Sequence, residues 1–259
     1  AASCPAGPAF EGGAITCGMP ALDGAIEDVA IDDATGDFKI GVIGGGAAQG
    51  ICGSGLVDLM SELLRTDAMN DMGRFDDGAH RVTLHDPARS RATPGDKRSE
   101  SPDSSSAHSD VYFTESDVNE LAQAKGANVA GLQVVANNYG VGFDDLDVFY
   151  LAGGFGRHLK VEASKRIGLI PNIADAKIVR VGNAAIEGAC IALLSKTKRA
   201  ELETLVRKVE HCRLETHPRF FDFFVEGCQF KPVESAAQEV GLDAAGVEAV
   251  GLDAGGKGG

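Results

Sequence analysis

The residues best suited to bind a ligand follow a short apolar segment in the second half of the chain. Residues 148–152 read VFYLA, an aromatic and β-branched run that is typical of a buried strand, and the segment Gly153-Gly-Phe-Gly156 follows it directly. Ligands of α/β proteins bind beyond the carboxyl ends of strands, where glycine allows the main chain to approach them closely. The sequence therefore predicts a ligand site at 153–156, with a simple tight turn as the alternative interpretation.

A charged residue interrupts the apolar stripe of a long predicted helix. This helix begins after Thr114, which forms a weak capping box with Asp117, and it extends to about Asn138. Lys125 lies within the apolar stripe. Its amine either extends out of the core along its own alkyl chain or reaches into a cleft. A helix of small residues at 183–192 can pack closely against a neighbour, and together with the lysine it strengthens the prediction of a ligand site.

A second glycine-rich loop lies earlier in the chain, at Gly50–Gly55. It precedes a helix whose apolar residues recur at helical spacing and for which Ser54 is the predicted N-cap. Free amides at a helix start can hold an anion, but the glycine spacing matches neither the dinucleotide-binding fingerprint nor the phosphate loop of nucleotide hydrolases. Close backbone packing is therefore the favoured interpretation of this loop.

The remaining pattern alternates short strands with helices, which predicts an α/β fold with a mixed sheet covered by helices. Further strands are predicted at 40–43 and 177–181, and further helices at 161–167 and 198–213. The phenylalanine run Phe220–Phe224 is predicted to pack as a cap over the sheet.

Composition divides the chain into two blocks that we expect to be structured, 1–75 and 111–231. Residues 76–110 contain few apolar side chains, three prolines and a serine cluster, so we expect a flexible low-complexity insertion there. Residues 232–259 are rich in glycine, alanine and acidic residues, and we expect them to form a disordered tail.

The charge balance limits the classes of partner. The chain has 259 residues, and 24 Lys and Arg against 38 Asp and Glu give a net charge of −14. Nucleic-acid-binding proteins normally present a basic face, so we expect no nucleic-acid partner. Because no apolar run approaches the ~20 residues of a membrane span and no leader is evident, we expect a cytoplasmic protein without membrane association. None of the six cysteines has the close spacing of zinc or iron–sulfur ligands, and no metal site is predicted.

Six segments follow one another along the chain and cover both structured blocks: AGPAFEGGAITCGM (Ala6–Met19), GICGSGLVDLM (Gly50–Met60), TESDVNELAQAKGA (Thr114–Ala127), DVFYLAGGFGRHL (Asp147–Leu159), IGLIP (Ile167–Pro171) and VGNAAIEGA (Val181–Ala189). Together they resemble the carboxyl-terminal ASKHA-type domain of reductive activators of corrinoid enzymes.

This resemblance implies the ATP-binding fold that acetate kinase, sugar kinases, heat-shock protein 70 and actin share. It also implies that the chain is the carboxyl-terminal part of a protein that uses ATP and Mg²⁺ to return the cobalt of a corrinoid protein from Co(II) to Co(I) for methyl transfer. A corrinoid protein is then the expected partner, and a homodimer is a further assembly to consider. A [2Fe–2S] cluster is expected only in a preceding amino-terminal region.

The resemblance assigns nucleotide contacts to three motifs. LAGGFGR is similar to the adenosine motif, in which paired glycines let the main chain lie against purine and ribose and Arg157 stacks on the base. AQAKG is similar to a purine-contacting helix, which places Lys125 at the nucleotide. PAFEGG follows the second phosphate loop, where Glu11 would hold a metal-bound water. The implied cofactor-binding residues are Gly12, Gly13, Lys125, Gly153, Gly154, Phe155, Gly156 and Arg157.

The chain also departs from the family pattern. It contains no DxGT phosphate loop and no iron–sulfur domain. Contacts to Mg²⁺ and phosphate supply most of the electrostatic binding energy for a nucleotide, so this chain alone is not expected to bind ATP with normal affinity. Without the iron–sulfur domain it is not expected to carry an electron. Three hypotheses follow: part of a reductive activator, an interaction module that docks a corrinoid protein without nucleotide, or a fragment of an ASKHA kinase or dehydratase activator.

Overall fold

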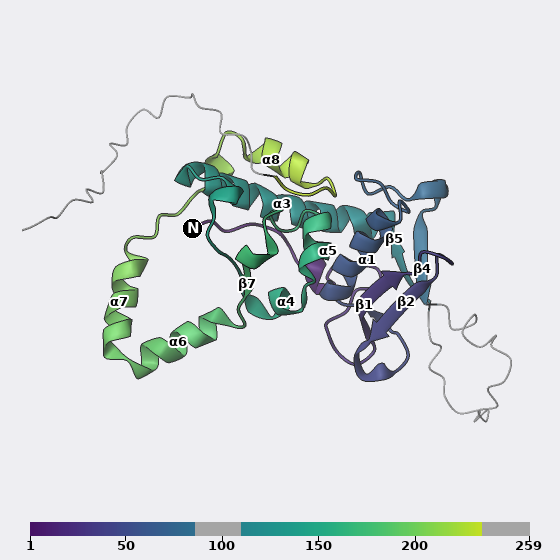
Figure 1. Cartoon of the computed structure of the whole chain (residues 1–259), viewed down its shortest axis with the longest axis horizontal. Coiled ribbons are helices and arrows are strands. Elements are labelled where there is room, and N and C mark those ends of the chain that lie inside the picture. Colours follow the sequence, from purple (N-terminus) through teal and green to yellow (C-terminus); the bar gives the residue numbers. More distant parts are fainter. Residues whose placement is uncertain (86–109, 235–259) are drawn as a thin grey trace, which may run out of the picture.

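A hairpin and one parallel strand form the first sheet of the structure, a computed structural model that describes residues 1–85 and 110–234 (Figure 1). β1 (Ala25–Ile31) pairs antiparallel with β2 (Phe38–Val42) and parallel with β3 (Gly50–Ile51). The strand order is therefore β2-β1-β3. Apolar residues of β1 are buried against α1 (Gly53–Arg65), whose leucines lie in the main core.

The glycines of the Gly50–Gly55 loop permit close packing at the start of α1. A Cβ atom on Gly55 would lie 2.3 Å from the carbonyl oxygen of Ile26, and one on Gly53 would lie 2.2 Å from that of Phe10. The expectation of close backbone packing is confirmed. The N-cap residue of α1 is Cys52, so the prediction of Ser54 as the cap was wrong.

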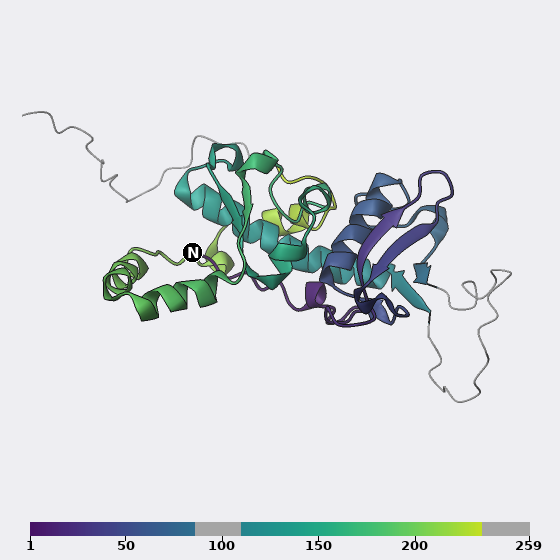
Figure 2. The ribbon, with the colours of Figure 1, turned by 60° about the horizontal axis from the view of Figure 1, so that its bottom comes forward.

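The long helix α3 (Glu115–Tyr139) extends from one lobe of the molecule to the other (Figures 1 and 2). Its start is the predicted capping box: the hydroxyl of Thr114 accepts a bond from the amide of Asp117, and the Asp117 carboxylate accepts one from the amide of Thr114. Gly140 ends the helix in the left-handed conformation, with φ of 72°. The predicted bounds and cap are confirmed.

One strand of a second sheet lies inside the range 76–110 that was expected to be a flexible insertion. β4 (Arg81–His85) pairs antiparallel with β5 (Val111–Thr114), and Leu84 and Phe113 are buried. The expectation of a flexible insertion was therefore wrong for 81–85, because the polar composition of the whole stretch concealed one short alternating strand. Residues 86–109 lie outside the described residues.

The second lobe is built around two short parallel strands, β6 (Phe149–Leu151) and β7 (Ile178–Arg180). α4 (Gly153–His158) and α5 (Val161–Arg166) lie between these strands in sequence. Phe149, Leu151 and Ile178 pack against the main core, which draws residues from both lobes.

The carboxyl-terminal helices take two different positions. α6 (Ala184–Leu194) and α7 (Lys196–Val206) project from the body as an arm, and neither helix has a buried residue (Figure 1). α8 (Phe220–Gly227) packs along α3, where Phe223 joins Ala130 and Val134 in a small second core. The prediction that the phenylalanine run caps the sheet was therefore wrong, because this run covers a helix.

Short 3₁₀ turns complete the fold, and they span Ala9–Glu11, Ile43–Gly45, Asp76–Gly78, Phe143–Asp145, Asp175–Lys177 and Leu214–Thr216. None of the helices in the described ranges has the length and hydrophobicity that crossing a membrane would require. The predicted tail lies outside the described residues from 235 onward.

Candidate functional site

An apolar pocket lies where two of the predicted motifs meet. Phe10 and Glu11, from the first 3₁₀ turn, line one part of it, and Phe155 and Gly156, from α4, line another. Its volume is about 290 Å³, close to the lower end of the ~300–1,000 Å³ typical of ligand pockets. The rings of Phe10 and Phe155 are 5.8 Å apart between centroids and tilted by 41°. The fold therefore brings together segments that are more than half the chain apart in sequence.

The diglycine at the start of α4 has open space in front of its main chain. A Cβ atom at Gly153 or Gly154 would meet no atom within 4 Å. Gly153 has a φ of 96° and needs to be glycine for that reason, whereas no positive φ constrains Gly154. The amide of Gly153 donates a hydrogen bond of 2.9 Å to the carbonyl of Gly182, which fixes the turn. The main chain is therefore accessible to a ligand rather than covered by side chains.

Gly12 and Gly13 have a packing reason to be glycine. Gly12 has a φ of 85°, and a Cβ there would lie 2.6 Å from the amide nitrogen of Met19. A Cβ at Gly13 would lie 2.9 Å from the ring of Pro8. Neither glycine lines the pocket, while their neighbour Glu11 does. Contact of these glycines with phosphate stays a prediction.

The structure places Lys125 away from the pocket. Its side chain is only 1% exposed, and its ammonium donates hydrogen bonds to the carbonyl oxygens of Gly227 and of Gln229, the latter at 2.7 Å. The ring of Phe230 lies 5.3 Å from the same nitrogen. The prediction that Lys125 lines the nucleotide site is therefore not supported, because this lysine faces α8.

Three other residues of α3, Ala124, Asn128 and Leu132, line the pocket instead. Ala124 and Asn128 lie on one face of the helix, about 100° and about 60° around the axis from Lys125 respectively. The side-chain amide of Asn128 donates to the carbonyl of Leu169 at 2.9 Å, which fixes its orientation at the pocket wall. Arg157 is exposed on the last turn of α4 and does not line the pocket. Helix α3 therefore lines the pocket through side chains other than Lys125, and its contact with a nucleotide stays a prediction.

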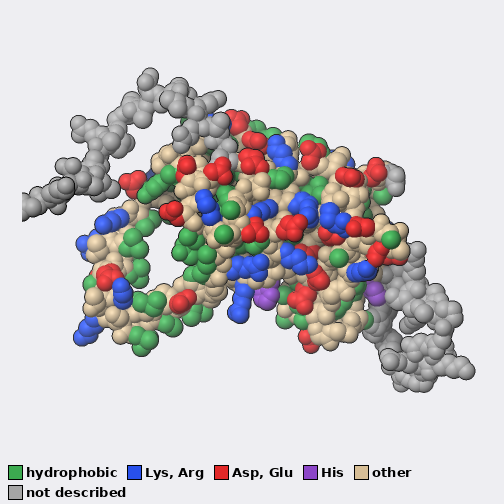
Figure 3. Space-filling view, viewed as in Figure 1, with side chains coloured by type: hydrophobic (Ala, Val, Ile, Leu, Met, Phe, Trp, Pro, Cys, Tyr) green, Lys and Arg blue, Asp and Glu red, His purple; other side chains and the backbone are tan. Residues whose placement is uncertain are grey.

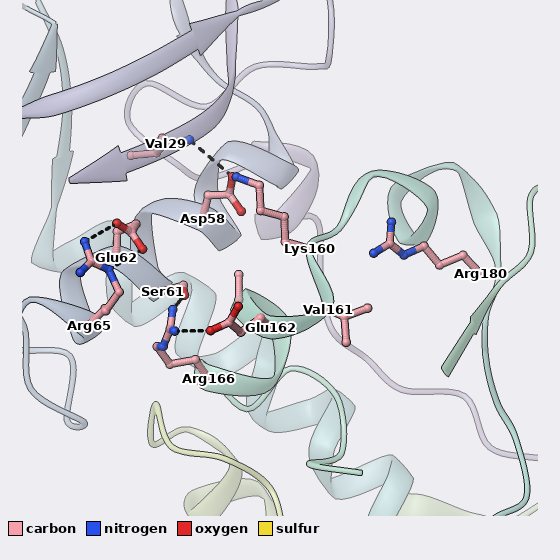
Figure 4. A pocket seen from close by; sticks show the side chains of 11 residues that line it. Val29, Asp58, Ser61, Glu62, Arg65, Lys160, Val161, Glu162, Arg166 and Arg180 are labelled. Atoms are coloured by element: carbon pink, nitrogen blue, oxygen red, sulfur yellow. Dashed lines mark hydrogen bonds and ion pairs between the residues drawn. The ribbon is translucent and has the colours of Figure 1, made fainter. Parts of the chain in front are cut away.

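A network of ion pairs lies next to the pocket, around a second cavity of about 410 Å³ (Figure 4). Lys160 follows Leu159, which lines the apolar pocket, and its ammonium lies 2.7 Å from the carboxylate of Asp58 and also contacts Asp28. Asp58 is 4% exposed, and burial raises its pKa to about 6. Lys160 thereby fastens the segment after α4 to α1 and β1.

Arg166 makes a second connection across this cavity. Its guanidinium donates to the hydroxyl of Ser61 on α1 at 2.6 Å and to Glu162 on its own helix at 2.9 Å (Figure 4). The guanidinium of Arg180 reaches the cavity from β7. Sequence reasoning missed this network. The available signal was a charged residue, Asp58, on the apolar face of α1, the same kind of signal that drew attention to Lys125.

The donor set of the described residues does not form a metal centre. No group of three His, Cys, Asp or Glu side chains in residues 1–85 and 110–234 is arranged to hold an ion. Glu11 contributes a single carboxylate at the pocket.

Comparison with known proteins identifies the family of the chain. Residues 1–240 match the family model described as the C-terminal domain of RACo, the ASKHA domain. The chain belongs to this family. It is 33% identical over 236 residues to the corrinoid activation enzyme RamQ of Eubacterium limosum, covering 88% of this chain and 39% of that protein.

Two further proteins show the same likeness. The chain is 26% identical over 248 residues to the [Co(II) methylated amine-specific corrinoid protein] reductase of Methanosarcina barkeri, covering 86% of this chain and 41% of that protein. A solved structure of a reductive activator for a corrinoid, iron–sulfur protein matches with a TM-score of 0.75 and 32% identity, over 89% of this chain and 36% of that one. The ASKHA family member described here therefore spans about two fifths of the proteins it resembles.

Proposed function

We propose that this domain supplies the nucleotide-base site of an ATP-dependent reductive activator, a protein that returns the cobalt of a corrinoid protein from Co(II) to Co(I) before methyl transfer. The observation that carries the proposal is the pocket in which the PAFEGG and LAGGFGR motifs meet. Membership of the RACo ASKHA family and the names of the relatives support the corrinoid protein as the partner.

The residues of the pocket suit a purine and its ribose. Gly153 and Gly154 do not line the pocket themselves, but they lie in sequence between the lining residues Ala152 and Phe155, so their open main chain can contact the edge of a bound ring. Phe155 and Phe10 provide an apolar wall. Arg157, exposed at the end of α4, is then available to stack on the base from outside. The phosphates and Mg²⁺ require groups that the described residues do not supply, so we assign them to other parts of a longer protein.

The role of nucleotide in such a reaction is to shift a conformational equilibrium. An energetically uphill electron transfer gains from ATP only if two conformations bind nucleotide with different affinities. Lys160 and Arg166 contact α1 across the cavity next to the pocket. A movement of α5 relative to α1 would break these contacts. No catalytic residue is assigned to this chain.

Adenosine is the sharpest probe of the proposal, because it lacks the phosphates for which this chain has no site. We expect weak, saturable binding of adenosine by calorimetry or ligand-observed NMR, with ATP binding no more than about tenfold tighter. Gly154→Leu fills the open space in front of the main chain and should weaken adenosine binding by at least about tenfold, roughly 1.4 kcal/mol. Gly46→Leu is the matched control, since its added side chain also meets open space, at a φ of −85° outside the pocket.

Unchanged adenosine binding in Gly154→Leu, or no saturable binding by the parent chain, would contradict the assignment.

One observation favours a second candidate function, an interaction module that docks a corrinoid protein without nucleotide. It is the lack, among the described residues, of a grouped set of metal ligands at the pocket. Capture of a corrinoid protein by this chain, equal with and without adenosine and in Gly154→Leu, would select that candidate.

A further inference from the structure

The arm formed by α6 and α7 presents apolar side chains that nothing in the described structure covers. No residue of either helix is buried. α6 contains a single charged residue, Glu187, in a sequence of alanine, isoleucine, leucine, glycine and cysteine. The large exposed side chains of the arm and its continuation are Ile186, Ile191, Leu193, Leu194, Leu202, Leu205, Val206 and Val209.

Such a surface is unusual for a chain with a net charge of −14. Leu194 is 85% exposed and Leu205 is 59% exposed. Extended apolar patches on soluble proteins mark interaction sites, because the water that contacts them is released when they are covered. The two helices also make few contacts with the body, and an opening separates them from it (Figure 3). The arm therefore needs a partner to hold it in a defined place.

The apolar surface continues onto the body. Tyr150 of β6 and Val179 of β7 are paired neighbours in the parallel ladder, and both are exposed, at 63% and 38%. Phe149 and Ile178, on the opposite face of these strands, pack against the core. Figure 3 shows hydrophobic side chains on the arm and on the part of the body across the opening. One face of the β6–β7 sheet is thus uncovered as well.

The first residue of the chain lies beside the arm. The amino group of Ala1 donates to the carbonyl of Glu210 at 2.5 Å, and the amide of Cys212 donates to the carbonyl of Ala1 at 2.6 Å. Residues 210–212 follow α7 closely. A polypeptide that joins this domain at Ala1 therefore arrives beside the segment that leads out of α7 (Figure 1).

We propose that the α6–α7 arm and the exposed face of β6–β7 form the docking surface for the region that precedes this domain in the longer members of its family. The preceding region binds there through the apolar face of a helix or of a sheet. This domain spans 36–41% of the matched proteins and carries the family's C-terminal position, so the larger remainder precedes it. Covalent attachment beside the arm gives that remainder a high effective concentration, an advantage that a second copy of the chain lacks.

The test compares the 259-residue chain with a fusion in which the part of the Eubacterium limosum relative that precedes its matched region is joined to Ala1. Hydrogen exchange of the amides at 184–206 is the measurement. We expect at least about tenfold slower exchange in the fusion than in the chain alone. Leu194→Glu with Leu205→Glu should return the exchange in the fusion to the rate of the chain alone. Leu22→Glu, at a residue that is 61% exposed outside the arm, should leave the protection intact.

Equal exchange at 184–206 in the two proteins would overturn the proposal. Sedimentation of the 259-residue chain tests it independently of whether the fusion folds. We expect a monomer at all concentrations, and Leu205→Glu should not change its unfolding temperature, since this leucine buries little surface within the chain. A dimer that Leu205→Glu dissociates would assign the arm to a second copy and overturn the proposal.

Discussion

Lys125 and Asp58 are charged side chains on buried faces of helices, and each is held by polar partners from a distant part of the chain. Lys125 on α3 binds the main chain after α8. Asp58 on α1 pairs with Lys160 and accepts a weaker hydrogen bond from the amide of Val29. Burying a charge is costly unless it is paired and hydrogen-bonded, so both residues should influence how stability depends on pH.

Lys125 should make the protein more stable as the pH rises above neutrality. Burial lowers the pKa of this lysine to about 7 from an ordinary value of 10.5. Between these values the unfolded chain holds a proton that the folded chain releases, so the free energy of unfolding increases with pH across this window. Lys125→Met should flatten the increase, as measured by urea denaturation at several pH values.

Lys196→Met, at an exposed residue of α7, is the control for that experiment. It should leave the pH dependence as it is in the parent chain. Parallel curves for the parent and Lys125→Met would show that this lysine does not titrate in the window.

Removing Lys160 should destabilise the protein more at about pH 8 than at about pH 5. The pKa of Asp58 is raised to about 6 by burial, so the folded state takes up its proton more readily than the unfolded state, and this residue's contribution to stability falls as the pH rises from about 4 to about 6. Lys160 offsets the charge of Asp58 and of the neighbouring Asp28. Without it the pKa of Asp58 rises further, and the loss of stability extends to higher pH.

Lys160→Met therefore needs denaturation curves at both pH values. Lys39→Met removes a surface pair with Asp32, in which the lysine side chain is 71% exposed, and such a pair contributes little to stability because solvent screens it. The free energy of unfolding could instead fall equally at both pH values in Lys160→Met, and by as much as in Lys39→Met. That result would mean that Asp58 remains neutral at both pH values.

Among the elements, the start of α3 connects three segments through one carboxylate. Asp117 is 1% exposed and accepts hydrogen bonds from the amide and hydroxyl of Thr16 and from those of Thr114. The amino-terminal motif is thus attached to the cap of the helix that lines the pocket. The capping box was visible in the sequence, whereas the bonds to Thr16 depend on the tertiary fold.

Asp117→Ala should lower the free energy of unfolding by about 2–4 kcal/mol, because it leaves several buried donors without an acceptor and removes the cap. Asn119→Ala, on an exposed position two residues further along the same helix, should change it by less than about 0.5 kcal/mol. Urea denaturation at neutral pH provides both values. Equal losses in the two variants would show that the cap contributes little.

Elements with their own local signals were predictable, and those that depend on partners were not. The cap and periodicity of α3 predicted its bounds, and the glycines at 153–156 predicted a turn open to ligand. β4 escaped prediction because a strand of five residues does not change the average composition of a long polar stretch. The direction of Lys125 escaped because an apolar stripe shows that a face is covered but not by which element.

The whole molecule combines a well-packed junction with an uncovered side. The main core joins both lobes through α1, α3 and the strands, and the pocket lies within this junction. The apolar sequence of α6 is typical of a buried helix, yet the described structure leaves it exposed. The family could be predicted from motifs in the sequence. Of the residues predicted to bind the cofactor, Phe155 and Gly156 line the pocket, and their contact with a nucleotide stays a prediction. The exposure of the arm became visible only in three dimensions.

Helix α3 connects the wall of the pocket to the end of α8. Ala124, at the wall of the pocket, and Lys125, at the carbonyls of Gly227 and Gln229, are consecutive residues of one rigid rod. If an occupant of the pocket rotated this helix slightly, the Lys125 ammonium would move relative to the carbonyl oxygens that it binds at the end of α8. The position of α8 would then respond to the pocket through a lysine that does not line it.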